Sequence, residues 1–173
     1  MNRFEILHAG PEDLGEMLRI YSAARAFMAR TGNPDQWGPM AWPPEALLHL
    51  DIRQGESYIC RRDGKTVGTF FLRYGTRPEP AYDRIEDGAW RWDGPYGVVH
   101  RIAGDGSVPG IGTACLSWSL AQCGHLRIDT HENNRVMRNL LGKLGFVRCG
   151  TVYPAADGTP RIAYEKQTLP RGS

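Results

Sequence analysis

Hydrophobic positions in the first part of the chain change from a strand-like to a helix-like spacing. Residues 4–8 have the short apolar pattern of a strand, and apolar residues then recur at helical spacing over residues 14–27. Pro11 and the two acidic residues after it suit the first turn of that helix, while the breaker cluster at residues 31–34 ends it. The pattern therefore predicts a strand followed by a long amphipathic helix.

The middle of the chain predicts a short helix, a hairpin and a long connection. Residues 45–52 again show helical spacing. Residues 57–61 and 66–74 read as strands, the second rich in β-branched and aromatic side chains, and the Asp-Gly pair between them is typical of a hairpin turn. Glycine, proline, aspartate and tryptophan dominate residues 75–95, which we expect to form a long loop or an irregular hairpin.

The remaining residues predict strands and helices in alternation, closed by a hairpin. In order these are a strand, a helix, a strand, a helix and two strands, at residues 97–103, 111–121, 126–130, 136–144, 146–153 and 161–165. Asn133 or Asn134 can cap the second of these helices, and Gly145 suits its C-terminal end. Because hairpins are mixed with βαβ units, this order predicts an α+β fold with a mixed sheet and helices on its faces.

Composition narrows the class of protein. The 173 residues are enough for one domain, which we place at residues 1–168 with a tail at residues 169–173. With a formal net charge of +2 and no basic run longer than Arg61-Arg62, the chain lacks the basic surface typical of nucleic-acid-binding proteins. It also lacks an apolar run long enough to span a membrane and an apolar N-terminal signal, so we expect a cytoplasmic protein.

The four cysteines carry no signal for a metal site or a disulfide framework. None belongs to a Cys-x-x-Cys pair, and the closest pair of metal-ligand types is Cys123 and His125, separated by one glycine. We therefore expect buried thiols in a reducing compartment and no metal ion.

Candidate chemistry lies in the turn between the strand at residues 97–103 and the helix at residues 111–121. This turn contains Gly110-Ile111-Gly112, where glycine lets the backbone approach a ligand closely and the free N–H groups of a helix N-terminus attract an anion. The residues alone leave a second interpretation open, a plain strand–helix turn that needs glycine for its backbone conformation.

Two known phosphate-binding motifs fit this turn poorly. A P-loop requires lysine and then serine or threonine after the last glycine, whereas Thr113 follows Gly112 here. A dinucleotide fingerprint matches in part, through Gly110, Gly112 and the acidic Asp129 that ends the next strand. Only one helix and a hairpin follow Asp129, fewer βα units than a doubly wound fold needs, so a nucleotide-binding oxidoreductase is the weaker interpretation.

From His100 to Tyr164 the sequence resembles the GNAT superfamily of acetyl-CoA-dependent N-acetyltransferases. That family has an Arg/Gln-x-x-Gly-x-Gly/Ala turn after its fourth strand, and residues 107–112 read SVPGIG. It also has the pattern Asn-x-x-Ala-x-x-Leu-Tyr-x-x-x-Gly-Phe, and residues 134–146 read NRVMRNLLGKLGF. The predicted elements on both sides follow the family's order, so the resemblance covers nearly the whole chain.

The resemblance implies a fold and a reaction. The fold is a twisted, mostly antiparallel sheet of about seven strands with about four helices on its faces, in which the fourth and fifth strands splay apart. The reaction moves an acetyl group from acetyl-CoA to a primary amine of a small molecule or peptide, by direct attack of the amine in a ternary complex. Nucleic acid and membranes are not expected partners, and a homodimer is left open.

The resemblance also implies where acetyl-CoA binds. Pantetheine pairs with the fourth strand, where one backbone N–H polarises the thioester carbonyl, and the pyrophosphate lies on the glycine turn. Arg135 and Arg138 either contact the 3′-phosphate of the cofactor or form a solvated helix face. The implied cofactor-binding residues are Arg101, Ile102, Ala103, Val108, Gly110, Ile111, Gly112, Thr113 and Asn134.

Two positions depart from the family's pattern. Ser107 replaces the Arg or Gln of the first motif, which implies that backbone amides rather than a side-chain charge hold the pyrophosphate. Leu141 replaces the tyrosine that often protonates the leaving thiolate, so that proton comes from solvent or from another group, with Tyr153 and Tyr164 as candidates. Both departures keep an alternative function open, a non-catalytic acyl-CoA-binding module or sensor.

The acceptor side of the reaction requires a general base and a pocket for the amine. A base with a pKa near the working pH, or a chain of waters, removes the amine proton before attack. The candidate bases are His131, Glu86, Asp129 and, within the fourth strand, His100. The candidate pocket residues are Trp37, Tyr74 and Trp90, for which core packing is the alternative.

Overall fold

The computed structural model describes residues 3–37, 41–154 and 158–168, and the chain divides into two compact units. The N-terminal unit comprises Met1–Leu72 and His100–Leu116, and the C-terminal unit comprises Arg73–Val99 and Ser117–Ser173. The single domain expected over residues 1–168 stays a prediction. The tail expected at residues 169–173 lies outside the described residues.

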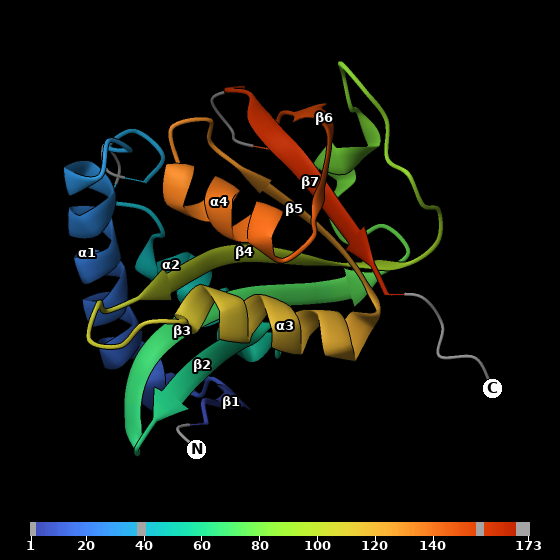
Figure 1. Ribbon diagram of the computed structural model, residues 1–173. Coiled ribbons are helices and arrows are strands. Elements are labelled where there is room, and N and C mark those ends of the chain that lie inside the picture. The colour runs from blue at the N-terminus through green and yellow to red at the C-terminus, as the bar shows by residue number, and fades with distance from the viewer. Residues whose placement is uncertain (1–2, 38–40, 155–157, 169–173) are drawn as a thin grey trace. The chain divides into compact units, whose positions relative to one another are not determined.

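The N-terminal unit contains the elements that its hydrophobic pattern predicts (Figure 1). They are β1 at Glu5–His8, the 3-10 turn η1 at Pro11–Asp13, α1 at Leu14–Arg30, α2 at Glu45–Arg53, β2 at Ser57–Arg62 and most of β3 at Lys65–Gly75. β2 pairs antiparallel with both β1 and β3. Asp63 and Gly64, between β2 and β3, have φ angles of 52° and 78°, which confirms the predicted hairpin turn.

The core of the N-terminal unit forms where α1 and α2 pack on the sheet. Met17, Ile20 and Tyr21 of α1 are buried together with Leu48 of α2. The three α1 residues are spaced by three and four positions along the helix, so their side chains share one face. Trp37 packs against this cluster, and its ring meets that of Tyr21 edge-on with centroids 5.8 Å apart.

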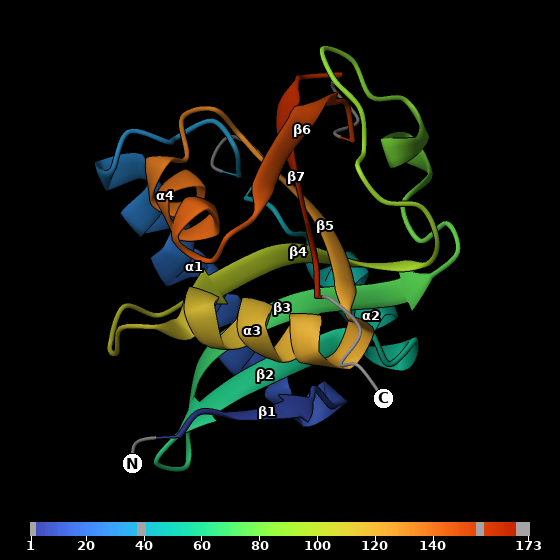
Figure 2. The same ribbon diagram turned by 45° about the vertical axis from the view of Figure 1, so that its right-hand side comes forward.

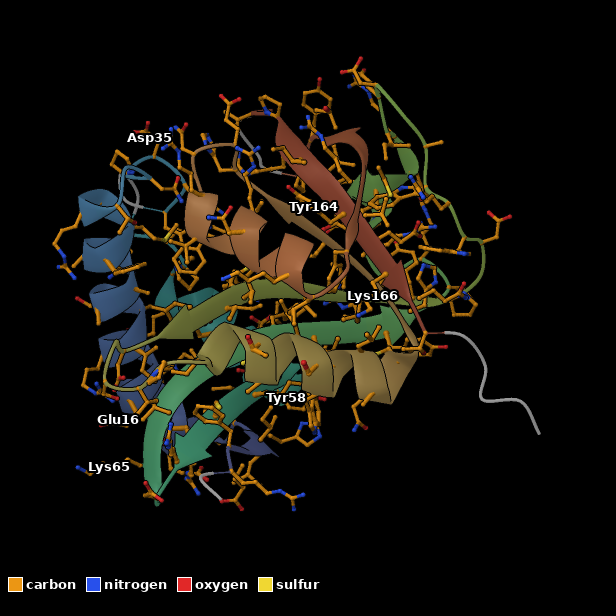
Figure 3. All side chains as sticks on the ribbon, in the orientation of Figure 1. Glu16, Asp35, Tyr58, Lys65, Tyr164 and Lys166 are labelled. Carbon is orange, nitrogen blue, oxygen red and sulfur yellow. The ribbon has the colours of Figure 1, made fainter. Side chains whose placement is uncertain are left out.

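The C-terminal unit contains the remaining elements. They are the 3-10 turn η3 at Pro80–Asp83, the start of β4 at Tyr96–Gly104, the end of α3 at Ile111–Cys123, β5 at His125–Thr130, α4 at Arg135–Lys143, β6 at Val147–Val152 and β7 at Arg161–Gln167. β7 pairs antiparallel with both β5 and β6 (Figure 2), and Tyr164, labelled on β7 in Figure 3, is buried.

The ends of α4 follow the sequence signals. Asn134 accepts the backbone N–H of Met137 at 3.1 Å through its side-chain oxygen and so caps the helix. Gly145, just after the helix, has a φ of 80°, the left-handed conformation typical of a helix C-terminus. Both predictions are confirmed.

The seven strands form one sheet in the order β1-β2-β3-β4-β5-β7-β6. β4 and β5 are parallel, whereas the β1–β2, β2–β3, β5–β7 and β6–β7 pairs are antiparallel. This confirms the predicted mixed, mostly antiparallel sheet. The recorded β4–β5 partners in the described residues are Gly97 with Leu126 and Val98 with Arg127, so residues 128–130 of β5 lie beyond the last recorded pair.

The structure also bears on membranes, metals and thiols. No helix of the described residues combines the length and the apolar character that a membrane span requires. The same residues include no group of three or more His, Cys, Asp or Glu side chains placed to hold a metal ion. Cys60, Cys115 and Cys149 are buried free thiols, and Cys123 is a half-buried one.

Candidate functional site

The predicted glycine turn leaves β4 at Gly104 and enters α3 at Ile111, entirely within the N-terminal unit. The N–H of Asp105 donates to the carbonyl of Val67 at 3.0 Å, which ties the turn to β3. Gly106 and Gly110 have φ angles of 81° and 88°, which glycine adopts without strain. These angles alone would suit a plain turn, so the case for a ligand depends on the donors that the turn presents.

The turn and the first residues of α3 present backbone N–H groups for which the described part of the chain provides no recorded acceptor. The N–H of Ala114 makes the first recorded helical bond, to the carbonyl of Gly110 at 3.0 Å. Within the described residues no acceptor is recorded for the N–H groups of Val108, Gly110, Ile111, Gly112 and Thr113. Unpaired donors are usual in the first helical turn, and together with a glycine turn they form an arrangement that binds phosphate groups.

Ser107, which occupies the position of the expected Arg or Gln, directs its hydrogen bonds to Asp105. Its N–H and its hydroxyl both donate to Oδ1 of Asp105, at 2.9 and 2.6 Å. Oδ2 of Asp105 accepts from Arg19 at 3.1 Å. Burial raises the pKa of Asp105, but the hydrogen bonds from Ser107 and Arg19 outweigh it and hold that pKa below its ordinary value. The carboxylate is therefore ionised at neutral pH.

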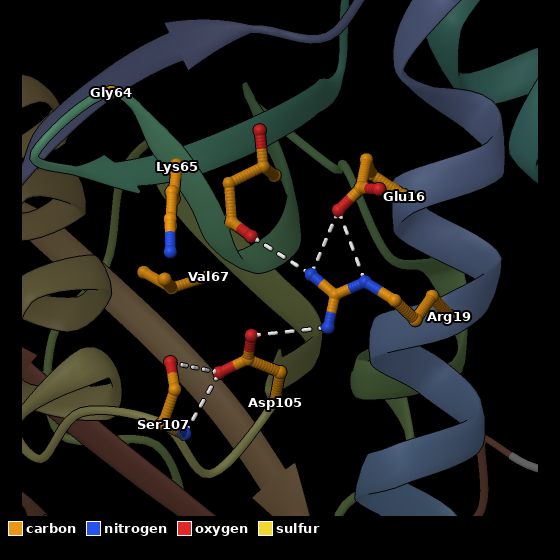
Figure 4. Close-up of a pocket in the computed structure, with 8 residues that line it drawn as sticks. Glu16, Arg19, Gly64, Lys65, Val67, Asp105 and Ser107 are labelled. Atoms are coloured by element: carbon orange, nitrogen blue, oxygen red, sulfur yellow. Dashed lines mark hydrogen bonds and ion pairs between the residues drawn. The ribbon is translucent and has the colours of Figure 1, made fainter.

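A groove of about 560 Å³ lies beside the turn (Figure 4). Its lining residues are Glu16, Arg19, Gly64, Lys65, Thr66, Val67, Asp105 and Ser107. Arg19 reaches across this groove from α1 and donates to Glu16 on its own helix, to the carbonyl of Thr66 at the start of β3 and to Asp105 in the turn. One guanidinium group thus joins three segments of the N-terminal unit.

Arg101 interrupts β4 with a left-handed backbone conformation, at a φ of 55°. Its side chain is 11% exposed, forms an ion pair with Asp51 of α2 and lies 4.7 Å from the ring centroid of Phe71, which also stacks with His100. Its carbonyl oxygen accepts the hydroxyl hydrogen of Tyr21 at 3.1 Å. Because a residue other than glycine holds this conformation only when its surroundings enforce it, these contacts fix the backbone of the predicted pantetheine strand.

Asp129, a candidate base, lies near the C-terminal end of β5 in the C-terminal unit. Its Oδ2 accepts the hydroxyl hydrogen of Tyr82 at 2.5 Å. Tyr82 is fully buried, and burial followed by the negative charge of Asp129 raises its pKa well above the ordinary value. The Tyr82 hydroxyl therefore remains a donor and orients the carboxylate of Asp129.

Glu86, the second candidate base, has both of its carboxylate oxygens engaged. Oε1 accepts from Nη2 and Nε of Arg84 at 2.5 and 3.1 Å, and Oε2 accepts the hydroxyl hydrogen of Tyr153 at 2.8 Å. The hydrogen bonds from Arg84 and then Tyr153 lower the pKa of Glu86, which weakens it as a base. The hydrogen bond to Glu86 in turn raises the pKa of Tyr153.

His131, the third candidate, follows β5 and accepts the N–H of Asn133 at Nδ1, at 3.0 Å. In a neutral imidazole the hydrogen then resides on Nε2, so the one nitrogen that can take a proton is already engaged. This local turn precedes the capping residue Asn134 and positions the start of α4.

A buried charged cluster in the C-terminal unit has no counterpart in the sequence predictions. Glu165 of β7 is fully buried, and it accepts from His125 at 2.7 Å, from Arg127 at 2.9 Å and from the N–H of Arg91 at 2.7 Å. Burial raises the pKa of Glu165, but these hydrogen bonds outweigh it and the pKa is lowered overall. The cluster ties the loop before β4 to β5 and β7.

The candidate pocket aromatics differ in their surroundings. Trp90 donates its indole N–H to the carbonyl of Tyr82 at 2.8 Å, and the guanidinium of Arg127 lies 4.4 Å from its ring centroid. These contacts, like those of Trp37 in the N-terminal core, favour the packing interpretation. Tyr74 is 57% exposed.

The second motif, on α4, is built around a buried leucine. Leu141 has no exposed surface, so the position that often carries the acid tyrosine is part of the core. The guanidinium of Arg138 donates to the carbonyl of Glu132 at 3.0 Å. Leu141 therefore cannot protonate the leaving thiolate, and the contact of Arg138 with the 3′-phosphate stays a prediction.

Comparisons with known proteins place these observations in context. Neither protein-family models nor curated protein sequences contain a match to this chain. Among solved structures, a GNAT-family acetyltransferase from Streptococcus agalactiae 2603 is 30% identical in sequence, and the two structures agree with a TM-score of 0.86 over 96% of each chain.

Two more distant structures share the fold. The histone acetyltransferase HPA2 and related acetyltransferase from Corynebacterium glutamicum ATCC 13032 is 21% identical, with a TM-score of 0.62 over 99% of this chain and 100% of the other. Naa50 from Arabidopsis thaliana, solved with the bisubstrate analogue CoA-Ac-MVNAL, is 13% identical, with a TM-score of 0.60 over 95% and 99%.

Proposed function

The chain belongs to the GNAT family of acetyltransferases, and we propose that it moves the acetyl group of acetyl-CoA to the primary amine of a small molecule or peptide. The observation that carries this proposal is the turn between β4 and α3, where the N–H groups of Val108, Gly110, Ile111, Gly112 and Thr113 have no recorded acceptor among the described residues. The analogue CoA-Ac-MVNAL of the Arabidopsis neighbour supports a CoA donor and a peptide as one class of acceptor.

The residues of the turn fit the pyrophosphate of CoA. The amide donors and the positive end of the α3 dipole suit an anion with several oxygen acceptors. Among the described residues, a Cβ added at Gly110 would have one neighbouring atom within 4 Å, Cε2 of Phe4 at 3.7 Å, so these residues leave the space beside this backbone open. Since the Ser107 hydroxyl donates a hydrogen bond to Asp105, we assign the binding of the pyrophosphate to backbone N–H groups. Asn134 stays a proposed contact of the cofactor.

In the proposed reaction the amine nitrogen attacks the carbonyl carbon of the thioester. A C–N bond forms, the C–S bond breaks, and CoA leaves as a thiolate. We assign the polarisation of the carbonyl to a backbone N–H in residues 101–103 of β4, the strand proposed to pair with pantetheine. The enforced conformation of Arg101 supports this assignment, because it sets the direction of the N–H groups that follow it.

We assign the proton of the attacking amine to Asp129. Arg84 and Tyr153 engage both carboxylate oxygens of Glu86, and the hydrogen bond from Arg84 lowers the pKa of Glu86. His131 has its acceptor nitrogen engaged by Asn133. Asp129 lies on β5 beyond the last recorded pair with β4, and Tyr82 holds its carboxylate in a defined orientation. Because Leu141 is buried and has no proton to donate, and the Tyr153 hydroxyl donates to Glu86, we assign the proton taken up by the departing thiolate to solvent.

The test is release of free CoA thiol from acetyl-CoA across a panel of diamines, amino acids and short peptides with free N-termini. The proposal predicts that at least one amine accelerates thiol release above the rate without amine, with an equal amount of acetylated product. Tight binding of acetyl-CoA without turnover of any amine would instead favour the acyl-CoA sensor.

A further inference from the structure

Asp105 is the residue on which the shape of the glycine turn converges. It accepts the N–H and the hydroxyl of Ser107 through one oxygen and Arg19 through the other. Its own N–H donates to the carbonyl of Val67. Its side chain is 9% exposed, the residue as a whole is half-buried, and its pKa is held below the ordinary value, so an ionised carboxylate lies within the turn that carries the candidate amide donors.

We propose that Asp105 and Arg19 are positioning residues of the pyrophosphate cradle, the set of N–H groups of Val108, Gly110, Ile111, Gly112 and Thr113. Asp105 holds the turn in its binding conformation, and Arg19 anchors Asp105 to α1 and β3. This inference rests on the proposed function. Neither residue contacts the ligand in this account. They act through the backbone amides, which take the place of the side-chain charge that Ser107 does not supply.

The negative charge of Asp105 explains why a cation, Arg19, is needed beside the turn. A carboxylate beside an anionic pyrophosphate is unfavourable unless a nearby cation offsets it. Arg19 supplies that cation, and it is itself held by Glu16 at 2.8 Å and by the carbonyl of Thr66 at 3.0 Å (Figure 4). Loss of the Arg19 side chain is therefore expected to have two effects. Asp105 loses its anchor to α1 and β3, and the negative charge of its carboxylate loses the neighbouring cation.

The first experiment measures the dissociation constant of CoA by titration calorimetry for the wild type, Asp105→Ala, Arg19→Ala and a control. Arg30→Ala is the matched control, because Arg30 is an exposed arginine in the last turn of the same helix, α1. We expect the dissociation constant to rise about tenfold in Asp105→Ala and Arg19→Ala and by less than about twofold in Arg30→Ala. Unchanged affinity in folded Asp105→Ala would overturn the proposal.

The second experiment separates a role in the cradle from a general effect on folding. With the amine found in the panel, kcat/KM is compared for acetyl-CoA and for S-acetylpantetheine, which has no pyrophosphate. The proposal predicts that Asp105→Ala lowers kcat/KM for acetyl-CoA about tenfold and leaves the value for S-acetylpantetheine within about twofold. An equal fall for both donors would show a merely structural role and overturn the proposal.

A third comparison uses a substitution at Asp105 that keeps the hydrogen bonds from Ser107, so that the turn is expected to keep its structure. Asp105→Asn retains the oxygen that accepts from Ser107 but removes the charge. In the Arg19→Ala background this change is expected to restore part of the lost CoA affinity, because the uncompensated carboxylate is gone. Further loss of affinity in the double variant would contradict the charge argument. A wild-type protein that binds no CoA would instead refute the proposed function itself.

Discussion

Tyr21 of α1 donates its hydroxyl hydrogen to the carbonyl oxygen of Arg101, at 3.1 Å, and so holds the one residue of β4 with a left-handed backbone. Burial raises the pKa of Tyr21 to about 12, so this hydroxyl stays protonated through the whole physiological range. The carbonyl of Arg101 thus has a permanent donor, and the backbone of the following residues has a fixed direction.

Tyr21→Phe tests this contact, because it removes the hydroxyl and keeps the buried ring. We expect a loss of about 1–2 kcal/mol in the free energy of unfolding, since the carbonyl of Arg101 loses its partner, and a lower kcat. Urea unfolding and steady-state kinetics measure the two effects. Phe27→Leu, at an exposed side chain of the same helix, is the control and is expected to change neither. A wild-type kcat in Tyr21→Phe would show that the conformation of Arg101 does not matter for turnover.

Gly110→Val tests the cradle. At a φ of 88° a β-branched residue is strained, and its side chain would occupy the open space beside the unpaired amides. Gly32→Val is the matched control, because Gly32 has a φ of 87°, no atom of the described residues lies within 4 Å of a Cβ added there, and it follows the end of α1. Both variants should lose similar stability, but only Gly110→Val should lose CoA binding in calorimetry. Equal CoA affinity in the two variants would count against the cradle.

Glu165 predicts how stability depends on pH. Its pKa is lowered in the folded protein, so its contribution is fully present above the ordinary glutamate pKa of about 4.3 and is lost as the pH falls through the folded value. Glu165→Gln should lower the melting temperature at pH 7, because it leaves Arg127 buried without a charged partner. It should also flatten the fall of the melting temperature below pH 4. A variant with the acid-side slope of the wild type would refute this assignment.

Asp129→Asn and Glu86→Gln distinguish the two carboxylate candidates for the base. If Asp129 accepts the amine proton, Asp129→Asn should lower kcat by a factor of about 100 or more, while Glu86→Gln should retain activity within about threefold. Steady-state kinetics of the two variants, with acetyl-CoA and the amine found in the panel, give this comparison. The reverse order of effects would transfer the role to Glu86 despite its lowered pKa.

Local patterns in the sequence are sufficient to predict most of the helices, strands and turns. The helical stripe of α1, the Asp63-Gly64 turn and the caps at Asn134 and Gly145 depend on neighbours within a few residues, so their structure follows from local rules. The glycine turn also follows from the sequence, because the motif at residues 107–112 and its companion at residues 134–146 are each short and continuous in the chain.

Contacts between distant residues could not be predicted in the same way. Glu165 meets Arg91 across 74 positions, and Arg19 meets Asp105 across 86, so no local pattern reports either contact. A charged residue in the apolar strand at residues 161–165 was a weak signal for a buried cluster, but it does not identify the partners. For the same reason the sequence does not report the ring contacts of Trp37 with Tyr21 and of Trp90 with Arg127.

The most direct test of the account is a thermal-shift measurement of the wild-type protein with acetyl-CoA and, separately, with NAD. A ligand at about 100 times its dissociation constant stabilises the folded state by about 2.7 kcal/mol, enough to raise the melting temperature by several degrees. The account predicts that acetyl-CoA produces this increase and NAD does not. An increase with NAD alone would contradict it.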